Sequence, residues 1–204
     1  MRIVVVGAGA LGAWAGAMLE RGGADVTLVA RGAHGEAMAA SGLEVRTRDG
    51  AFTVRPAVVP SVAAAFAAPG AGFDVALVTV KSWASEGVGA ELAAAGRVGR
   101  VVSLQNGVGN EAVLAAALAH RPAPPPAERA VAVCDDVGAG TVTVGVTVER
   151  PGVVAASTRG GVGLGRDGGG WAGRLATHFA GGGVMVALYD DPVALKWSKL
   201  LLNM

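Results

Sequence analysis

The sequence predicts an α/β protein with a doubly wound, mainly parallel sheet and appended antiparallel strands. Apolar runs of strand length alternate with Ala-rich runs of helical length through about the first 120 residues. After a Pro-rich stretch at 122–126, short Val- and Thr-rich segments separated by Gly follow one another without a helix between them. Such segments favour antiparallel pairing. Hydrophobic residues make up 52% of the 204 positions, enough for a sizeable core.

The N-terminus is predicted to form one strand–helix–strand unit. Arg2–Val6 is a continuous apolar, β-branched run, as expected for a strand buried on both faces. Leu11–Arg21 is an Ala-rich helix candidate that Gly22-Gly23 ends, and Asp25–Ala30 is the second strand. The length of this unit is that of a right-handed crossover connection.

The alternation of strands and helices continues to residue 120. Asp49-Gly50 is a strong hairpin signal between the predicted strands Leu43–Arg48 and Phe52–Val59. The other predicted strands of this part are Asp74–Val80 and Arg100–Leu104. The predicted helices are Gly35–Ser41, Ser61–Ala68 with Ser61 as its cap, Ser82–Ala95, and Asn110–His120 with Asn110 as its cap.

The last third of the chain is predicted to consist mainly of strands. These are Ala130–Cys134, Thr141–Glu149, Val153–Thr158, Val162–Gly165 and, after a helix at Trp171–Ala180, the edge strand Val184–Leu188. Asp190-Asp191-Pro192 supplies an N-cap and a first-turn proline for a final helix, Pro192–Asn203. We assign residues 1–189 to one domain and residues 190–204 to the start of a second.

Charge and cysteine content exclude several classes of protein. The formal net charge is +1, so no charge excess points to nucleic acid or to an anionic membrane surface. Every apolar run is broken well before the ~18 residues that a bilayer span requires. The lone Cys134 excludes an internal disulfide framework, and the apolar N-terminus has no convincing cleavage site, which together predict a cytoplasmic protein. His34, His120 and Cys134 show no metal-ligand spacing, so we expect no metal.

Gly7-Ala8-Gly9-Ala10-Leu11-Gly12 is a G-x-G-x-x-G motif that leaves a predicted strand and opens a predicted helix. In a Rossmann-like fold, Gly7 permits the tight turn, Gly9 lets the backbone approach a pyrophosphate, and Gly12 lets the helix pack on the strand. The helix N-terminus offers amides to the phosphates. The alternative is a Gly-rich turn without function, since the chain holds 33 glycines.

The end of the second predicted strand distinguishes the two nicotinamide dinucleotides. An NAD site usually places Asp or Glu there to bind the ribose 2′-hydroxyl. Here the chain reads Val29-Ala30-Arg31-Gly32, and a guanidinium pairs with a 2′-phosphate that an acid would repel. NADP(H) is therefore preferred to NAD(H), unless Arg31 is an ordinary surface arginine.

Further candidates follow other predicted strands or lie on the last helix. Lys81 and the Gln105–Asn110 segment (QNGVGN) come directly after two buried strands, where open α/β sheets bind ligands. Taken singly, Lys81 would more often be a surface lysine and Asn106-Gly107 more often a turn. Lys199 and Asn203 share a face of the last helix, where an ammonium beside an amide could donate to a ketone oxygen. The alternative for Lys199 is a solvated helix lysine.

Taken together, these stretches resemble the ketopantoate reductase (2-dehydropantoate 2-reductase) family over nearly the whole chain. The matching segments are GAGALG at Gly7–Gly12, VARG at Val29–Gly32, VKSW at Val80–Trp83, SLQNGVGNE at Ser103–Glu111 and KWSKLLLN at Lys196–Asn203. The QNGVGN and K-W-x-K-x-x-x-N patterns are the most specific, because ordinary dinucleotide-binding folds lack them.

The resemblance implies NADP(H) as cofactor and assigns roles to its binding residues. It implies that Gly7–Gly12 hold the pyrophosphate and that Arg31 and Lys81 lie around the adenosine 2′-phosphate. Gln105 belongs to the cofactor site, and Asn106 lies between the nicotinamide ribose and the substrate.

On the substrate side, the resemblance implies that Lys199 is the general acid and that Asn203 helps to fix a small 2-oxo acid. The implied reaction is the NADPH-dependent reduction of ketopantoate to pantoate, in pantothenate and coenzyme A biosynthesis. Family members are longer and carry an all-helical second domain, which supplies a substrate-binding glutamate and much of the subunit contact. We therefore expect this chain to contain only the first helix of that domain, to bind NADPH and to turn over feebly.

Three alternatives remain open from the sequence. The parent enzyme could reduce another branched 2-oxo acid, or the chain could be a non-catalytic NADP(H)-binding module. It could also be a structural remnant that forms a homodimer through the apolar Leu200–Leu202 stretch of its last helix.

Overall fold

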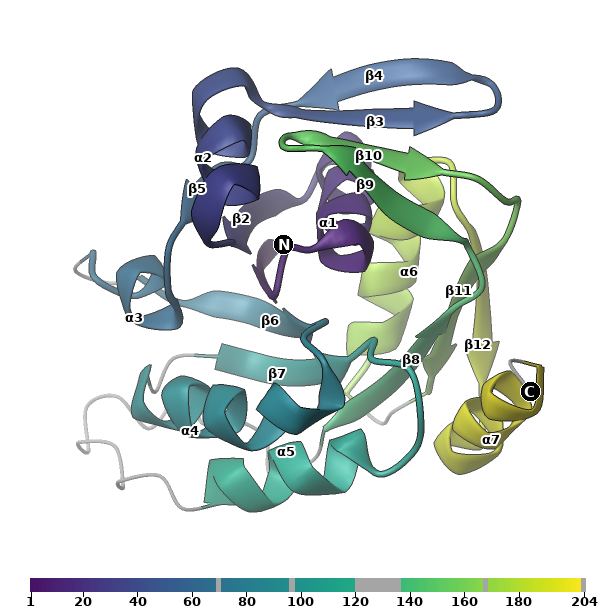
Figure 1. The fold of residues 1–204 in the computed structure, drawn as a ribbon. Coiled ribbons are helices and arrows are strands. Elements are labelled where there is room, and N and C mark those ends of the chain that lie inside the picture. Colours follow the sequence, from purple (N-terminus) through teal and green to yellow (C-terminus); the bar gives the residue numbers. More distant parts are fainter. Residues whose placement is uncertain (69–70, 96–97, 120–136, 167–168, 203–204) are drawn as a thin grey trace.

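The computed structural model describes residues 1–68, 71–95, 98–119, 137–166 and 169–202. Its centre is an eight-stranded sheet (Figure 1). The strands are β1 (Arg2–Val6), β2 (Asp25–Val29), β5 (Ala57–Val59), β6 (Phe73–Val78), β7 (Val98–Ser103), β8 (Gly138–Val142), β11 (Gly161–Gly165) and β12 (Met185–Tyr189). Their order is β12-β11-β8-β7-β6-β1-β2-β5, and all neighbours are parallel except β8 and β11. The predicted doubly wound, mainly parallel sheet is confirmed.

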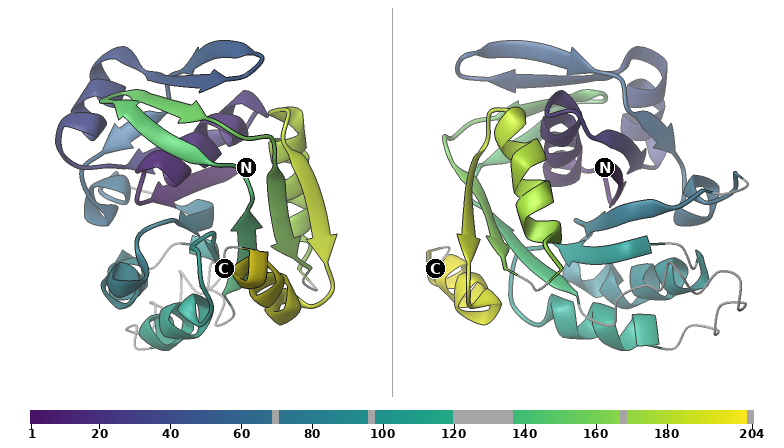
Figure 2. Two further views of the ribbon diagram at one scale, coloured as in Figure 1. Left: turned by 45° about the vertical axis from the view of Figure 1, so that its right-hand side comes forward. Right: turned by 180° about the vertical axis from the view of Figure 1, so that it is seen from behind.

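Helices cover both faces of this sheet. They are α1 (Ala10–Arg21), α2 (Gly32–Ser41), α3 (Val62–Ala65), the 3-10 helix η1 (Ser82–Ala84), α4 (Ser85–Ala95), α5 (Asn110–Ala119), α6 (Trp171–Gly181) and α7 (Pro192–Leu202). The adjacent helices α1 and α6 cover one face, and the adjacent helices α4 and α5 cover the other (Figures 1 and 2). Trp14 and Phe179 belong to the buried apolar cluster of the first face, and Leu92 and Leu114 to that of the second.

A four-stranded sheet lies beside α1, on the side away from the central sheet (Figure 1). Its strands are β3 (Leu43–Thr47), β4 (Gly50–Val54), β9 (Val146–Arg150) and β10 (Val153–Ala156), in the order β4-β3-β10-β9. The hairpin predicted at Asp49-Gly50 is confirmed, with Thr47 paired to Gly50, whose φ of +133° favours glycine. The antiparallel pairs predicted for the last third are β9 with β10 and β8 with β11.

Two predicted strands are wrong as single elements. The stretch 52–59 divides into β4 and β5, and the stretch 141–149 divides into β8 and β9; in each case the two strands belong to different sheets. Pro56 separates the first pair and has no N–H for a ladder. Gly145 separates the second pair, and its N–H donates to Thr158 Oγ1 at 2.7 Å where the chain crosses between sheets.

The sequence predicts an N-cap side chain at the start of three helices, and the structure shows which of these caps form. Ser61 accepts a hydrogen bond from the Ala64 N–H, and Asp191 Oδ1 accepts from the N–H groups of Val193 and Ala194, which confirms both caps. The cap predicted at Asn110 is wrong, because its side chain bonds Ser85 Oγ and the Asn106 carbonyl instead.

The C-terminal helix α7 packs on β8 and β11, and the division of the chain after residue 189 stays a prediction. The predicted strand Ala130–Cys134 and the predicted helix end at Asn203 lie outside the described residues. None of the described helices is both long and apolar enough to cross a bilayer.

The strand order determines where a ligand can bind. The chain passes from β1 to β2 on one side and later returns to β6 on the other side of β1. The carboxyl ends of β1, β2, β6 and β7 therefore meet at one edge of the sheet, and in open α/β sheets the crevice at such a reversal is the ligand site.

Candidate functional site

The bend between β1 and α1 has a shape that only glycine fits at its first position. Gly7 has a φ of +100°, and a Cβ there would lie 2.6 Å from a side-chain carbon of Val80. The N–H groups of Gly7 and Ala8 both donate to the Val29 carbonyl, at 3.3 and 3.0 Å. The bend is thus held between the ends of β2 and β6.

Gly9 and Gly12 differ in what surrounds them. A Cβ on Gly12 would lie 2.5 Å from both the Gly7 carbonyl oxygen and Thr79 Oγ1, so α1 needs glycine to approach the bend. Thr79 Oγ1 also donates to the Gly7 carbonyl at 2.9 Å. A Cβ on Gly9 would meet nothing within 4 Å. Gly12 therefore serves packing, whereas Gly9 leaves space open beside the exposed backbone.

The first turn of α1 begins directly after this bend. Gly9 is the N-cap, and its own N–H donates to the Gly7 carbonyl at 2.7 Å. The amides of Ala10, Leu11 and Gly12 follow, and first-turn amides have no acceptor within the helix. The first turn carries no acidic residue. The positive end of the helix dipole and these amides together favour an anion such as a phosphate.

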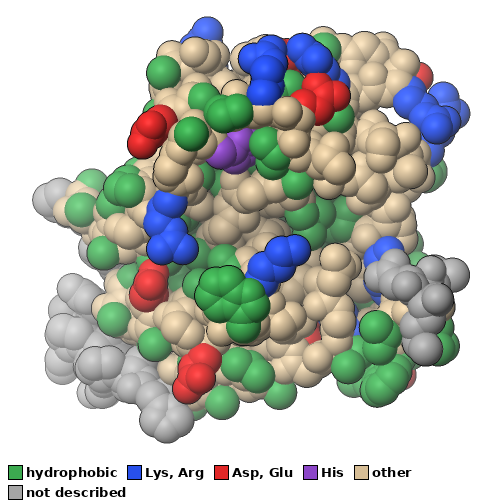
Figure 3. Space-filling view, in the orientation of Figure 1, with side chains coloured by type: hydrophobic (Ala, Val, Ile, Leu, Met, Phe, Trp, Pro, Cys, Tyr) green, Lys and Arg blue, Asp and Glu red, His purple; other side chains and the backbone are tan. Residues whose placement is uncertain are grey.

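A cavity of about 420 Å³ joins this bend to basic residues from two other strand ends. Gly7, Ala8 and Gly9 line it together with Arg31, which follows β2, and Lys81, which follows β6. Both basic side chains are exposed, and the described lining residues include no carboxylate. Figure 3 shows this face, on which basic side chains flank a central hollow. The cavity is therefore suited to a ligand with several phosphate groups.

Three further lining residues were missed by the sequence reasoning. Trp83 on η1 is 85% exposed, although it is large and apolar. Val148 of β9 brings the four-stranded sheet to the cavity, and His34 comes from α2. Only Trp83 had a signal, since it belongs to the VKSW stretch that contains Lys81. The other two depend on tertiary packing.

The His34 ring is fixed by the four-stranded sheet. Its Nδ1 accepts a hydrogen bond from the Gly152 N–H at 3.1 Å, which fits a neutral imidazole with its proton on Nε2. Burial lowers the pKa of His34 below its ordinary value of 6.5. The folded protein therefore disfavours the protonated ring.

We expect the free energy of unfolding to decrease as the pH falls below 6.5, because the unfolded chain then binds the His34 proton more readily than the folded chain does. The contribution of the His34 side chain to the free energy of unfolding is fully present above pH 6.5. It is lost as the pH falls through the depressed pKa of the folded state. Urea titrations across this range should show a smaller decrease in the variant His34→Asn, whose Oδ1 occupies the position of the ring Nδ1 and can still accept from Gly152. Identical pH dependences would contradict the interpretation.

The Gln105 side chain is buried and bonds other groups of the protein. Its side chain is 4% exposed, and its Nε2 donates to the Val80 carbonyl at 2.9 Å and to Ser85 Oγ at 2.8 Å. Its Oε1 accepts from Ser103 Oγ at 3.3 Å. These bonds use both amide hydrogens, so the geometry gives no support to the predicted cofactor contact of this side chain. Asn106, next to it, is exposed.

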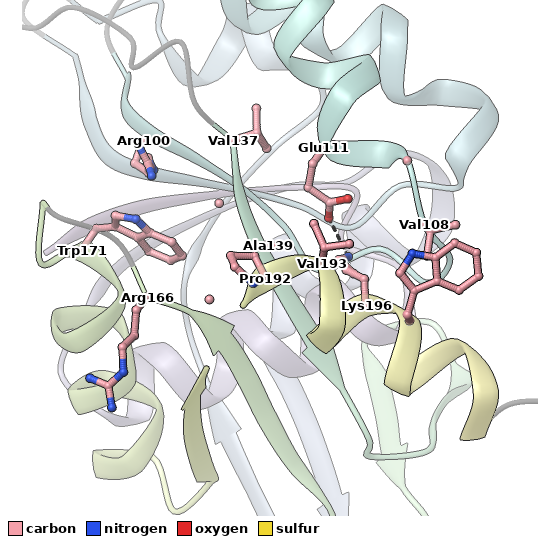
Figure 4. A pocket seen from close by; sticks show the side chains of 14 residues that line it. Arg100, Val108, Glu111, Val137, Ala139, Arg166, Trp171, Pro192, Val193 and Lys196 are labelled. Carbon is pink, nitrogen blue, oxygen red and sulfur yellow. Dashed lines mark ion pairs between the residues drawn. The ribbon is translucent and has the colours of Figure 1, made fainter. Parts of the chain in front are cut away.

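Lys196 of α7 contacts the backbone of Gln105. Its side chain is 5% exposed, and its Nζ donates to the Gln105 carbonyl at 2.9 Å and forms an ion pair with Glu111 Oε1 at 2.8 Å (Figure 4). Burial lowers the pKa of Lys196, and the Glu111 carboxylate opposes that effect. Sequence spacing could not reveal this pair, because its partners lie far apart along the chain.

Lys199, the predicted general acid, is half-buried one turn beyond Lys196 on α7. Its predicted partner Asn203 lies outside the described residues. A second cavity, of about 370 Å³, adjoins Lys196 and extends toward Trp171 and Arg166 (Figure 4). Among the described residues, His, Cys, Asp and Glu form no group of three that could hold a metal.

A family model and the curated relatives of the chain point to the same protein family. Residues 3–169 match the family model described as ketopantoate reductase PanE/ApbA. The 2-dehydropantoate 2-reductase of Halobacterium salinarum is 34% identical and that of Pyrococcus horikoshii is 30% identical; each alignment covers 100% of this chain, and they cover 62% and 61% of the relatives. The chain thus spans about three-fifths of the length of these curated relatives.

Solved structures agree with this assignment. A PanE/ApbA family ketopantoate reductase from Ralstonia eutropha superposes with a TM-score of 0.80 at 30% identity, covering 100% of this chain and 61% of that one. D-mandelate dehydrogenase in complex with NADH has a TM-score of 0.72 at 20% identity, covers 100% and 60%, and shows the shared fold alone. From its matched motifs, its fold and its relatives, the chain belongs to the ketopantoate reductase family.

Proposed function

We propose that this chain binds NADPH at the edge of the central sheet and forms the cofactor-binding part of an enzyme that reduces ketopantoate to pantoate. The observation that carries this proposal is the single cavity lined by the Gly7–Gly9 bend, Arg31 and Lys81. It combines an open Cβ position at the N-cap of α1 with two cations that follow β2 and β6, the two neighbours of β1 in the sheet.

The lining residues fit a 2′-phosphorylated dinucleotide. The amides of Ala10 and Leu11 would hold the diphosphate, because Gly9 lets it approach the backbone. Arg31 and Lys81 would hold the 2′-phosphate, the guanidinium by paired hydrogen bonds and the ammonium as a point charge. The exposed indole of Trp83 offers a flat face for a heteroaromatic ring.

For the reaction, bound NADPH supplies a hydride to the carbonyl carbon of the 2-oxo acid. Lys199 is the proposed general acid: its ammonium stabilises the charge that develops on the carbonyl oxygen and then donates a proton to that oxygen. Asn106 is the proposed contact between the nicotinamide ribose and the substrate, and Asn203 is proposed to orient the substrate. Gln105 is better assigned to holding in place the loop of residues 104–109 between β7 and α5, here called the Asn106 loop.

The reductase proposal is tested by mixing excess protein with NADPH and following its oxidation in a single turnover. We expect ketopantoate to be reduced faster than pyruvate or 2-oxoisovalerate. Lys199→Met should slow reduction about 10²- to 10⁴-fold, as expected for loss of a general acid. Ser198→Ala, an exposed neighbour on α7, is the matched control and should leave the rate unchanged.

Other outcomes of this experiment would overturn parts of the proposal. Faster reduction of a different 2-oxo acid would change the substrate, and NADPH binding without any oxidation would favour a non-catalytic NADPH-binding module. An unaffected rate in Lys199→Met would remove Lys199 from the mechanism.

A further inference from the structure

On the basis of the function proposed above, we infer that Lys196 is a positioning residue: it fixes α7 and the Asn106 loop relative to each other, so that Lys199 and Asn106 meet at the nicotinamide end of the cofactor. Lys196 is the first residue of the K-W-x-K-x-x-x-N motif, but no role has been assigned to it above. Its side chain is turned into the protein rather than toward the cavity that holds Arg31 and Lys81.

The contacts of Lys196 join three elements. Its ammonium, on a side chain only 5% exposed, lies 2.9 Å from the carbonyl of Gln105, which follows β7, and 2.8 Å from Glu111, in the first turn of α5. The Glu111 side chain is 20% exposed. A buried charge without its partner is strongly unfavourable, so removing either group disrupts this arrangement. The pair therefore selects one placement of α7 against the loop.

The Asn106 loop is also hydrogen-bonded on its other side. The Gln105 side chain donates to the carbonyl of Val80, the residue before Lys81, and to Ser85 Oγ. Asn110 Nδ2 donates to the Asn106 carbonyl at 3.0 Å, and Asn110 Oδ1 accepts from Ser85 Oγ at 3.5 Å. A continuous set of polar contacts thus runs from α7 through the Asn106 loop to the strand end that carries Lys81.

Helix geometry relates Lys196 to Lys199. Residues three apart on an α-helix lie on one face, so Lys199 follows Lys196 by one turn on the face that meets the Asn106 loop. The preceding residue, Leu195, is 6% exposed, and α7 packs on β8 and β11. Apolar packing thus attaches the helix to the sheet, while Lys196 determines its rotation and its distance from the loop.

An ion pair suits positioning better than it suits stability. Replacing a buried ion pair with apolar groups of similar volume is often neutral or stabilising. An apolar pair would, however, lack the directional bond to the Gln105 carbonyl. The double variant Lys196→Met/Glu111→Leu is therefore expected to fold while losing the defined loop position.

The test compares the affinity for NADPH with that for 2′,5′-ADP, which carries the 2′-phosphate but no nicotinamide. In Lys196→Met and in the double variant, we expect the Kd of NADPH to rise about tenfold, equivalent to ~1.4 kcal/mol. The Kd of 2′,5′-ADP should stay within about twofold, because Arg31 and Lys81 are unchanged. A general loss of structure would weaken both ligands alike. Ser198→Ala is again the control, and calorimetric titration gives all values.

A turnover measurement adds an independent readout. The single-turnover rate at saturating NADPH and ketopantoate should fall in both variants, since saturation removes the effect of weaker binding. Folded variants that keep the wild-type ratio of the two affinities and the wild-type rate would overturn the role of Lys196. An unmodified chain that binds neither ligand would instead overturn the proposed function, and this inference with it.

Discussion

Replacing both Arg31 and Lys81 with alanine is expected to weaken NADPH binding by at least about 100-fold, while NADH binding changes by less than about threefold. Each cation is proposed to form a charge-assisted hydrogen bond to the 2′-phosphate, and such bonds contribute about 1.5–3 kcal/mol. NADH has a 2′-hydroxyl at that position and loses little when the cations are removed. Fluorescence or calorimetric titration with both dinucleotides measures the change in preference.

The single variants Arg31→Ala and Lys81→Ala should each account for about a tenfold loss. Arg159→Ala is a suitable control, because Arg159 is a highly exposed arginine paired with Asp49 and does not line the cavity. Since the attraction is electrostatic, raising the salt concentration should reduce the preference for NADPH. Equal losses for NADPH and NADH would show that these cations contact groups common to both dinucleotides.

Adding one methyl group at Gly9 and one at Gly12 is expected to give opposite results. Gly9→Ala should keep the free energy of unfolding within about 1 kcal/mol of the unmodified chain, since its Cβ would meet nothing within 4 Å. The same methyl occupies the space proposed for the diphosphate, so NADPH affinity should fall at least tenfold, or ~1.4 kcal/mol.

Gly12→Ala should instead destabilise the fold. Its Cβ would lie 2.5 Å from the Gly7 carbonyl oxygen and Thr79 Oγ1, and the required backbone shift costs about 1–3 kcal/mol. Thermal unfolding should show a decrease in Tm of several degrees, at ~2–4 °C per kcal/mol for a chain of this size. If Gly9→Ala bound NADPH normally, the open space beside Gly9 would not be the diphosphate site.

The parts of the site that the sequence predicted depend on local chain geometry. One short segment specifies β1, the bend and α1, because Gly7 and Gly12 each stand where a Cβ would clash, whereas Gly9 leaves the space beside the bend open. Arg31 and Lys81 were located by a topological rule, since residues after parallel strands meet at one sheet edge. The Asp49-Gly50 hairpin is also local, and a positive φ at Gly50 explains it.

The parts that the sequence missed depend on contacts between distant segments. The sequence pattern predicts strands at 52–59 and at 141–149, but it does not show that the chain passes from one sheet to the other within each stretch. Both sheets accept β-branched residues equally well, so the residue types do not mark the crossing. The Lys196–Glu111 pair and the His34–Gly152 bond are long-range contacts without a sequence signature. The sequence predicts Gln105 at the cofactor, and only the structure shows that its side chain bonds the Val80 carbonyl and Ser85 Oγ.

The four-stranded sheet contacts several elements around the proposed cofactor site. It packs on α1, fixes His34 through Gly152 and brings Val148 to the cavity that Arg31 lines. The antiparallel strands of the last third thus contribute to the wall of the proposed cofactor site, beside the strand ends that hold the phosphate-binding residues.

The most direct measurement of the central claim is a calorimetric titration of the unmodified chain with NADPH and, separately, with NADH at one salt concentration. We predict one NADPH per chain and an affinity for NADPH at least about tenfold higher than for NADH, because two cations and no carboxylate line the described part of the cavity. Equal affinities, or tighter binding of NADH, would contradict the assignment of Arg31 and Lys81 to the 2′-phosphate.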